Sequence, residues 1–189
     1  MGVSDRKAEK LETERGFRVK KILVVVDYQK DFVDGALGFE GAELLDERIC
    51  KKIEEYRGSE VVHTLDTHTE NYPNTQEGKL LSIAHCIKGT DGHKNYGKTA
   101  EKLAGTRAFE KPGFGSWELG EYLRSGGYDR VELCGLVSYI CVITNAIIAK
   151  TALPEAEIIV DSRCTSGFDK ELHSAALSVM EGLQIKVIR

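Results

Sequence analysis

The stretch Ile22-Leu-Val-Val-Val-Asp27 decides the fold, because four of its five apolar residues are β-branched and a carboxylate follows at once. A short apolar run of this kind is typical of a strand buried on both faces of a parallel sheet. Similar strands are predicted further along the chain at Glu60–Leu65, Arg107–Glu110, Arg130–Gly135, Glu157–Asp161 and Ile185–Ile188.

Amphipathic stretches alternate with these strands and predict the helices between them. In Glu43–Tyr56, apolar residues recur near helical spacing and Gly58 follows as a stop signal. The other predicted helices are Trp117–Ser125, Ser138–Thr151 and Lys170–Glu181. This alternation predicts an α/β fold of three layers, with a mostly parallel six-stranded sheet covered by helices on both faces.

The length of 189 residues fits one domain, which we place at residues 19–189 behind a polar N-terminal extension over residues 1–18. Residues 67–105 contain many glycines together with proline and asparagine, and predict a long, irregular excursion with one short helix. So long a loop in a compact domain usually serves function.

Composition limits the partners that this chain can have. The net charge is −4 and no basic stripe occurs, which argues against nucleic acid as a partner. The apolar runs are too short to span a membrane, and the first residues lack the apolar core of a secretory signal. We therefore expect a cytoplasmic protein whose five cysteines stay reduced.

The residues with side chains suited to catalysis or metal binding follow the predicted strands. They are Asp27, Asp66, Lys111, the segment from Gly135 to Cys141, and Asp161. In parallel sheets, ligands bind beyond the carboxyl ends of the strands, so these residues should meet at one edge.

Cys141 lies where a predicted strand gives way to a helix, in what should be the first helical turn. A helix N-terminus and a nearby lysine both favour a thiolate, and a carboxylate can accept the thiol proton. Asp27, Lys111 and Cys141 thus form a plausible catalytic set. In the alternative interpretation Asp27 is a cap, Lys111 a surface charge and Cys141 a packing residue. Cys164 is the main rival nucleophile.

A second group of residues could hold a metal ion. Asp66-Thr-His68 is followed by Glu77 and His85, and two imidazoles with carboxylates suit zinc, with iron or manganese as alternatives. His63 and His173, within a strand and a helix, are interpreted as structural, and His93 remains open.

Several motifs occur in the order and spacing of a known family. They are Val25-Val-Asp-Tyr-Gln-Lys-Asp-Phe32, Leu65-Asp-Thr-His68, Ala84-His-Cys-Ile-Lys-Gly-Thr-Asp-Gly92, Glu110-Lys-Pro-Gly-Phe114, Cys134-Gly-Leu-Val-Ser-Tyr-Ile-Cys-Val142 and Asp161-Ser-Arg-Cys-Thr-Ser166. Over residues 21–189 the chain resembles the isochorismatase-like cysteine hydrolases, and among them the nicotinamidases (pyrazinamidases).

The resemblance implies a role for each residue of the catalytic set. Asp27 would be the general base, Lys111 the cation that stabilises thiolate and oxyanion, and Cys141 the nucleophile. The backbone N–H groups of Val137 and Cys141 would form the oxyanion hole, behind a cis peptide bond between Leu136 and Val137.

The resemblance also implies how a substrate would be held. One divalent metal ion on Asp66, His68, Glu77 and His85 would position a pyridine ring. Phe32 and Phe114 would sandwich that ring.

The implied reaction is hydrolysis of nicotinamide to nicotinate and ammonia through a cysteine thioester, which would serve NAD salvage. Phe114 stands where many nicotinamidases carry tyrosine, so a second hypothesis is hydrolysis of another small carboxamide or of a carbamoyl or ureido compound. A third is a non-catalytic protein on the same fold that binds a metal or ligand. Members of the family are often oligomers, so a homo-oligomer is expected.

Overall fold

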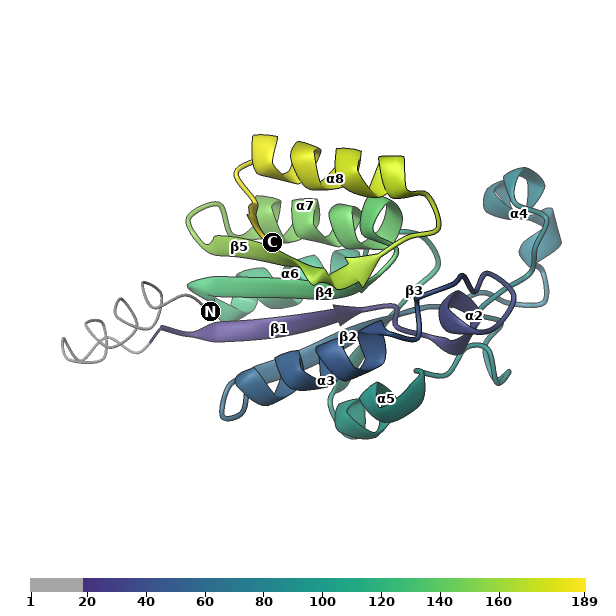
Figure 1. Cartoon of the computed structure of the whole chain (residues 1–189), viewed down its shortest axis with the longest axis horizontal. Coiled ribbons are helices and arrows are strands. Elements are labelled where there is room, and N and C mark those ends of the chain that lie inside the picture. Colours follow the sequence, from purple (N-terminus) through teal and green to yellow (C-terminus); the bar gives the residue numbers. More distant parts are fainter. Residues whose placement is uncertain (1–18) are drawn as a thin grey trace.

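The computed structural model describes residues 19–189, in which one six-stranded sheet lies between two layers of helices (Figure 1). The predicted extension over residues 1–18 lies outside the described residues. The strands are β1 (Lys21–Val26), β2 (Glu60–Asp66), β3 (Arg107–Lys111), β4 (Arg130–Leu136), β5 (Glu157–Ser166) and β6 (Lys186–Ile188). The predicted three-layer α/β class is confirmed.

The strand order is β3-β2-β1-β4-β5-β6, and every pairing within the sheet is parallel. The chain builds outward from β1 through β2 to β3, and then returns to start β4 on the other side of β1. The order therefore reverses between β1 and β4, and such a reversal opens a crevice at the carboxyl ends of the strands.

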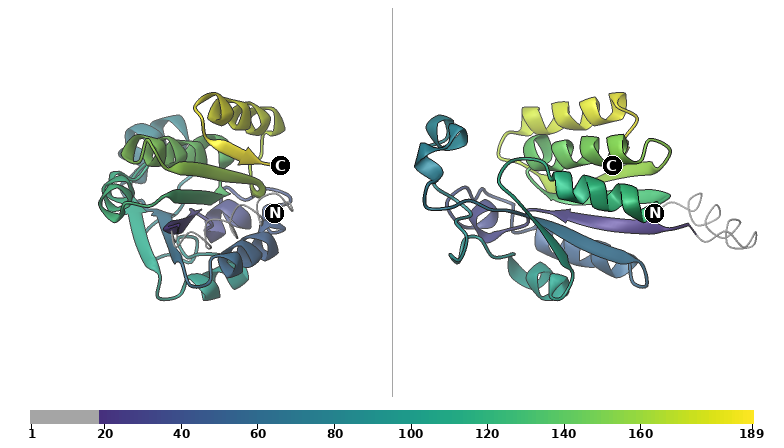
Figure 2. Two further views of the ribbon diagram at one scale, coloured as in Figure 1. Left: turned by 90° about the vertical axis from the view of Figure 1, so that its left-hand side faces the viewer. Right: turned by 180° about the vertical axis from the view of Figure 1, so that it is seen from behind.

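The α-helices and shorter helical turns are α2 (Lys30–Val33), α3 (Leu45–Glu55), η1 (Tyr72–Asn74), α4 (Gln76–Leu80), α5 (Gly97–Leu103), α6 (Trp117–Gly126), η2 (Ser138–Val142), α7 (Ile143–Ala152) and α8 (Lys170–Gly182). Helices α6, α7 and α8 cover one face of the sheet, α3 and α5 cover the other, and α2 lies beyond the carboxyl end of β1 (Figures 1 and 2). Alternate residues of β1 divide between the two cores: Val24 packs toward α6 and α7, and Val25 toward α3.

Local signals explain where several helices begin and end. The Ser116 hydroxyl accepts a hydrogen bond from Leu119 N and so caps α6, which ends at Gly127 in the left-handed region (φ +59°). Asp169 caps α8 in the same way through Glu171 N and Leu172 N. Such caps satisfy amide groups that the first turn of a helix leaves without intrahelical partners.

Three sequence predictions about the elements need correction. Strand β5 continues past Asp161 to Ser166, so Asp161 lies inside a strand and does not mark its end. The predicted helix over residues 138–151 starts as a π-helical turn, η2, before α7. The excursion over residues 67–105 contains η1, α4 and α5, where a single short helix was predicted.

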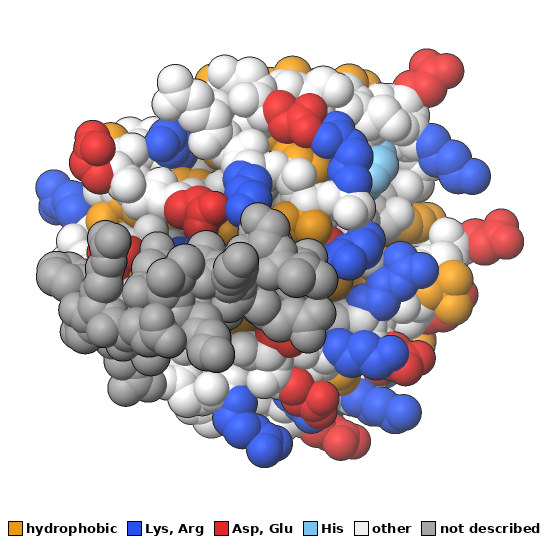
Figure 3. Space-filling model, turned by 60° about the vertical axis from the view of Figure 1, so that its left-hand side comes forward, with side chains coloured by type: hydrophobic (Ala, Val, Ile, Leu, Met, Phe, Trp, Pro, Cys, Tyr) orange, Lys and Arg blue, Asp and Glu red, His pale blue; other side chains and the backbone are white. Residues whose placement is uncertain are grey.

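The surface carries charges of both signs. Lys and Arg side chains lie beside Asp and Glu side chains on the face shown in Figure 3. Ion pairs such as Lys186–Glu157 and Arg189–Glu181 are of this exposed kind, and such pairs contribute little to stability. No helix within residues 19–189 has both the length and the apolar character needed to cross a membrane.

Gly135 in β4 allows a close backbone approach to β1 at the centre of the sheet. Its φ is +112°, and a Cβ at this position would lie 2.0 Å from the carbonyl oxygen of Val26 in β1. Any side chain would therefore push apart the two strands whose ends carry the residues of interest.

We expect Gly135→Ala to lower the free energy of unfolding by about 3–5 kcal/mol, through backbone strain combined with overpacking. Urea denaturation would measure it. Gly182→Ala is the matched control, since nothing lies within 4 Å of a Cβ there and the residue ends α8. That control should be neutral or slightly stabilising. Equal midpoints for both variants would contradict the packing argument.

Candidate functional site

The carboxyl ends of three neighbouring strands bring polar side chains to one edge of the sheet. Asp27 follows β1, while Asp66 and Lys111 are the last residues of β2 and β3 and pair in register. Cys141 lies in η2, directly beyond β4. These side chains therefore lie at the crevice between β1 and β4, where the strand order reverses.

Asp27, Lys111 and Cys141 meet in space as predicted. The Lys111 ammonium lies 2.6 Å from Asp27 Oδ2 and 3.6 Å from Cys141 Sγ. It also donates a 2.9 Å hydrogen bond to the carbonyl of Gly113. The exposed fraction of each of the three residues is 5% or less. One buried cation therefore bridges a carboxylate and a thiol.

Asp27 is held in an unusual conformation. Its φ is +43°, a region that residues other than glycine rarely occupy, and Thr64 secures it from the neighbouring strand. The Thr64 hydroxyl donates a 2.6 Å hydrogen bond to Asp27 Oδ1, and the Thr64 carbonyl accepts one from Asp27 N. The carboxylate is thereby directed at Lys111.

The surroundings of Lys111 keep it protonated. Burial acts to lower the pKa of its ammonium, but the negative charges on Asp27 and Asp66 and the hydrogen bond to Asp27 outweigh that effect, and the pKa rises. A charged lysine is what the proposed thiolate and oxyanion stabilisation requires.

The electrostatics of Cys141 differ from the sequence prediction of an acidified thiol. Burial raises the pKa of its thiol well above the usual value, and the charge of Asp27 raises it further. The charge of Lys111 lowers this pKa, but by less than the other two causes raise it. Burial also raises the pKa of Asp27, against the influence of Lys111. Burial is the largest cause of the raised thiol pKa, and because the thiol also shares Lys111 with the Asp27 carboxylate, the lysine does not bring that pKa below its usual value.

The segment around Cys141 has the backbone that the family resemblance implies. The peptide bond between Leu136 and Val137 is cis, and the carbonyl of Val137 accepts hydrogen bonds from Ile140 N and Val142 N within η2. Ser138 is fully buried, and its hydroxyl lies 2.8 Å from His173 Nδ1 on α8. The turn that carries the thiol is therefore fixed by hydrogen bonds within η2 and by the contact with α8.

Asn145 is a contributor that the sequence analysis did not single out. Its amide Nδ2 donates to the carbonyls of Cys141 (2.8 Å) and Phe114 (3.1 Å), and its Oδ1 accepts from Ser116 N (3.0 Å). It thus ties the loop after Lys111 to the turn that carries the thiol. The available signal was an asparagine one turn beyond Cys141, on a helix whose neighbouring residues Ala146 and Ala149 are apolar.

Gln29 has a similar structural role beside the second cluster. Its side-chain amide donates to the carbonyls of Asp66 and His93, and its Oε1 accepts from Asp66 N. A fully buried glutamine therefore fixes the backbone of Asp66 in position. His93, left open by the sequence, contacts the Thr67 hydroxyl through Nε2 at 2.8 Å.

Asp66, His68 and His85 form a compact cluster whose possible ligand atoms all lie within 4.8 Å of one another. Asp66 Oδ2 is 3.1 Å from His68 Nε2 and 3.3 Å from His85 Nε2. Glu77 Oε1 approaches from α4, at 3.8 Å from His68 Nε2 and 3.7 Å from His85 Nε2. The four predicted ligands thus converge on one place.

The donor set fits a divalent cation. His85 Nδ1 lies 2.9 Å from the carbonyl of Ile83, which can only accept, so Nδ1 carries a proton and Nε2 is the nitrogen that faces the cluster. Burial acts to raise the pKa of Asp66, but hydrogen bonds with His68 and His85 and the charge of Lys111 hold it well below its usual range. Two imidazoles and two carboxylates suit zinc, iron or manganese.

The two predicted ring-binding residues differ in exposure. Phe32 is buried, with its ring centroid 5.6 Å from that of His85. The side chain of Phe114 is 50% exposed, although its carbonyl is fixed by Asn145. Phe32 therefore borders the cluster of possible metal ligands, whereas the ring of Phe114 is open to solvent.

Burial raises the thiol pKa of the rival cysteines as it does that of Cys141, and what distinguishes Cys141 is its contact with the Lys111 ammonium. Cys164 lies inside β5, where burial raises the pKa of its thiol to about 12. Burial also raises the pKa of Cys134, which lies inside β4, and of Cys50, which lies in α3. His63 is buried in β2 and contacts Thr106, as expected for a structural histidine.

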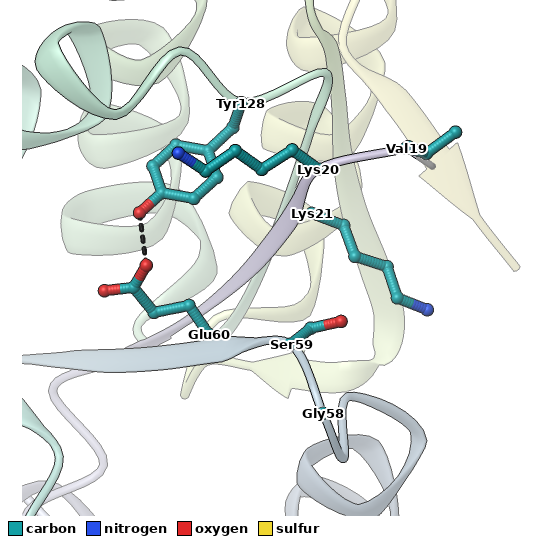
Figure 4. Close-up of a pocket in the computed structure, with 7 residues that line it drawn as sticks. All are labelled: Val19, Lys20, Lys21, Gly58, Ser59, Glu60 and Tyr128. Atoms are coloured by element: carbon teal, nitrogen blue, oxygen red, sulfur yellow. Dashed lines mark hydrogen bonds between the residues drawn. The ribbon is translucent and has the colours of Figure 1, made fainter. Parts of the chain in front are cut away.

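A cavity of about 430 Å³ lies at the opposite edge of the sheet, beside the start of β1 (Figure 4). There the Tyr128 hydroxyl donates to the Glu60 carboxylate, and the Lys20 ammonium lies over the Tyr128 ring. The lining contains none of the residues of the catalytic set or the metal-ligand cluster. This cavity is therefore separate from the group of reactive side chains at the carboxyl edge of the sheet.

The sequence profile of the isochorismatase domain matches residues 21–189. A search of curated protein sequences found no match. Among solved structures, the fold is similar to a nicotinamidase from Bacillus subtilis, with a TM-score of 0.80 and 26% identity over 90% of this chain and 100% of that one.

Two further solved structures show the same likeness. A pyrazinamidase of Pyrococcus horikoshii in complex with zinc has a TM-score of 0.79 and 25% identity, covering 90% of this chain and 99% of that one. A pyrazinamidase/nicotinamidase from Streptococcus mutans has a TM-score of 0.76 and 28% identity, covering 89% and 99%.

Because Lys111 contacts both Asp27 and Cys141, replacing the lysine and replacing the aspartate should change the alkylation rate of Cys141 in opposite directions. We expect Lys111→Met to slow alkylation of Cys141 by iodoacetamide at pH 7 about tenfold, because the positive charge that lowers the thiol pKa is lost. Asp27→Asn should accelerate alkylation, because it removes the carboxylate that raises that pKa.

Mass spectrometry would locate the label and give its rate, with Cys141→Ala as the blank. Rates that move in the same direction in Lys111→Met and Asp27→Asn would contradict the arrangement described.

Proposed function

The chain belongs to the isochorismatase family, and on that basis we propose that it is a cysteine amidohydrolase that converts nicotinamide to nicotinate and ammonia. The observation that carries this proposal is the position of the Lys111 ammonium, 2.6 Å from a carboxylate of Asp27 and 3.6 Å from the sulfur of Cys141. A metal-ligand cluster lies beside it, with Asp66 Oδ1 3.6 Å from the same ammonium.

The first step forms a bond between Cys141 Sγ and the amide carbon. Because burial and Asp27 keep the resting thiol protonated, its proton passes to the Asp27 carboxylate as the sulfur attacks. The raised pKa of Asp27 makes it a better acceptor than an ordinary aspartate. Lys111 stays charged throughout and stabilises the sulfur as it loses the proton.

The second step breaks the carbon–nitrogen bond. Asp27 returns the proton to the leaving nitrogen, ammonia departs and a thioester to Cys141 remains. The backbone N–H groups of Val137 and Cys141 are proposed to stabilise the oxyanion, and one such donor is typically worth about 3 kcal/mol of barrier. Water activated by Asp27 then cleaves the thioester, which releases the carboxylic acid and restores the thiol.

Asp66, His68, Glu77 and His85 would hold a divalent ion, with zinc first among the candidates because a similar pyrazinamidase carries it. When bound, the ion would supply a Lewis-acid contact that orients the pyridine nitrogen. The buried ring of Phe32 borders that place, and we propose that it packs against the substrate ring. Nicotinate formed in this way would enter NAD salvage.

One observation favours a second candidate substrate. The ring of Phe114, the other proposed wall, is half exposed, whereas Phe32 is buried. A smaller carboxamide, or a carbamoyl or ureido compound, would react through the same Asp27, Lys111 and Cys141 without needing that wall. The reaction class is the same in both cases.

We expect the zinc-loaded wild-type protein to release ammonia from nicotinamide, and Cys141→Ala to lower kcat by a factor of about 10³ or more, since the bond-forming atom is lost. Cys164→Ser is the matched control, because it removes a buried thiol inside β5, and it should retain wild-type kcat. An inactive wild-type enzyme would eliminate nicotinamide as the substrate, and carbamoyl and ureido compounds would be tested next.

Metal removal separates the two candidate substrates. After chelation, nicotinamide turnover should fall at least tenfold and return on addition of zinc, because the ring loses its orienting contact. Glu77→Gln should raise the zinc concentration needed for recovery. Unchanged turnover of the metal-free protein would instead support a substrate that Cys141 attacks without help from the cluster.

A further inference from the structure

Tyr72 in η1 packs against both histidines of the metal-ligand cluster. Its ring centroid is 4.7 Å from that of His68 and 5.1 Å from that of His85, with interplanar angles of 63° and 75°. The two imidazoles are themselves 4.9 Å apart at 73°. Three rings thus meet edge to face, an arrangement that aromatic quadrupoles favour and that restricts ring rotation.

The hydroxyl of Tyr72 reaches the far end of α4. It donates a 2.9 Å hydrogen bond to the carbonyl of Leu81, the residue that ends this helix. The amide of Leu81 in turn donates to the carbonyl of Glu77. The end of the helix that carries the fourth possible ligand is therefore connected to Tyr72.

The backbone of Tyr72 fixes the beginning of the same helix. Its carbonyl accepts hydrogen bonds from the amide (2.9 Å) and the hydroxyl (2.7 Å) of Thr75, and that hydroxyl caps α4 through Gly78 N. A Cβ on Gly78 would lie 2.0 Å from the Tyr72 carbonyl oxygen, so α4 packs directly on this residue.

Helix α4 needs such an attachment. It is only five residues long and stands apart from the helices that cover the sheet, as Figures 1 and 2 show. A helix of this length is not stable by itself, so contacts with η1 must define where Glu77 lies. The side chain of Tyr72 is 1% exposed, and its contacts are with the two imidazole rings and the carbonyl of Leu81.

We infer that Tyr72 is a positioning residue of the metal site, whose ring sets the orientation of His68 and His85 and whose hydroxyl sets the position of Glu77. This inference rests on the metal site of the proposed function, but not on the substrate. Residues behind metal ligands typically change metal affinity 10- to 100-fold when they are replaced. Simple core packing would instead lower stability without a selective effect on metal affinity.

The test measures the zinc affinity of the metal-stripped, full-length protein by competition with a chromophoric chelator. Tyr72→Leu removes the ring and should weaken zinc binding about 10- to 100-fold. Tyr72→Phe keeps the ring and removes only the hydroxyl, so it should weaken binding about fivefold. Tyr122→Phe is the matched control: it likewise removes a hydroxyl that donates a hydrogen bond, here to the Glu60 carboxylate, but Tyr122 lies in α6, and zinc affinity should not change.

A double-mutant cycle distinguishes the effect of the Tyr72 hydroxyl on Glu77 from the effect of the Tyr72 ring on the two imidazoles. If the hydroxyl acts through α4, Tyr72→Phe should cause no further loss of zinc affinity once Glu77→Gln is present. Tyr72→Leu should still weaken binding in that background, because its effect also passes through the imidazoles. Thermal melts of the metal-free variants would report their stability independently.

Wild-type zinc affinity in folded Tyr72→Leu and Tyr72→Phe would overturn the inference, as would an equal loss in Tyr122→Phe. If Tyr72→Leu does not fold, Tyr72→Phe and its cycle with Glu77→Gln decide the matter. A wild-type protein that binds no zinc would overturn both this inference and the metal part of the proposed function. Zinc binding without hydrolysis of nicotinamide would refute only the substrate.

Discussion

The buried ion pair between Lys111 and Asp27 is the constraint on which the rest of the site depends. Removing two charges from water is costly, and the cost is offset only where geometry and further contacts are good. Here the order β3-β2-β1 places the ends of β3 and β1 on either side of Asp66, so the lysine crosses the end of β2 to reach its partner. The thiol of Cys141 lies beside the ammonium that this ion pair holds in place.

That lysine also couples the two halves of the site. Asp66 faces Lys111 with Oδ1 and the two imidazoles with Oδ2, so one carboxylate belongs both to the charge cluster around the thiol and to the group of possible metal ligands. Because the charges are shared, the sulfur is not simply acidified: Asp27 and burial oppose the lysine. In the proposed mechanism, this arrangement favours proton transfer during attack over a permanent thiolate.

Much of the fold could be predicted from periodicity alone, since β-branched runs and amphipathic stretches report which faces are buried. All six strands were located, and the convergence of Asp27, Lys111 and Cys141 followed from the rule that parallel strands end at one edge. The extension of β5 to Ser166 was missed because its pairing with β4 has no local sequence signal, and the π-helical form of η2 was missed because apolar spacing does not distinguish it from an α-helix.

The sequence by itself determined the layer order of the fold and the kinds of reactive group at its edge, because these depend on residue type and spacing along the chain. Only the tertiary structure decided the direction of the thiol pKa and the supporting roles of Asn145 and Tyr72. Those properties depend on burial and on contacts between distant segments. A thiol, an amide or a phenol has no fixed function until the fold determines what surrounds it.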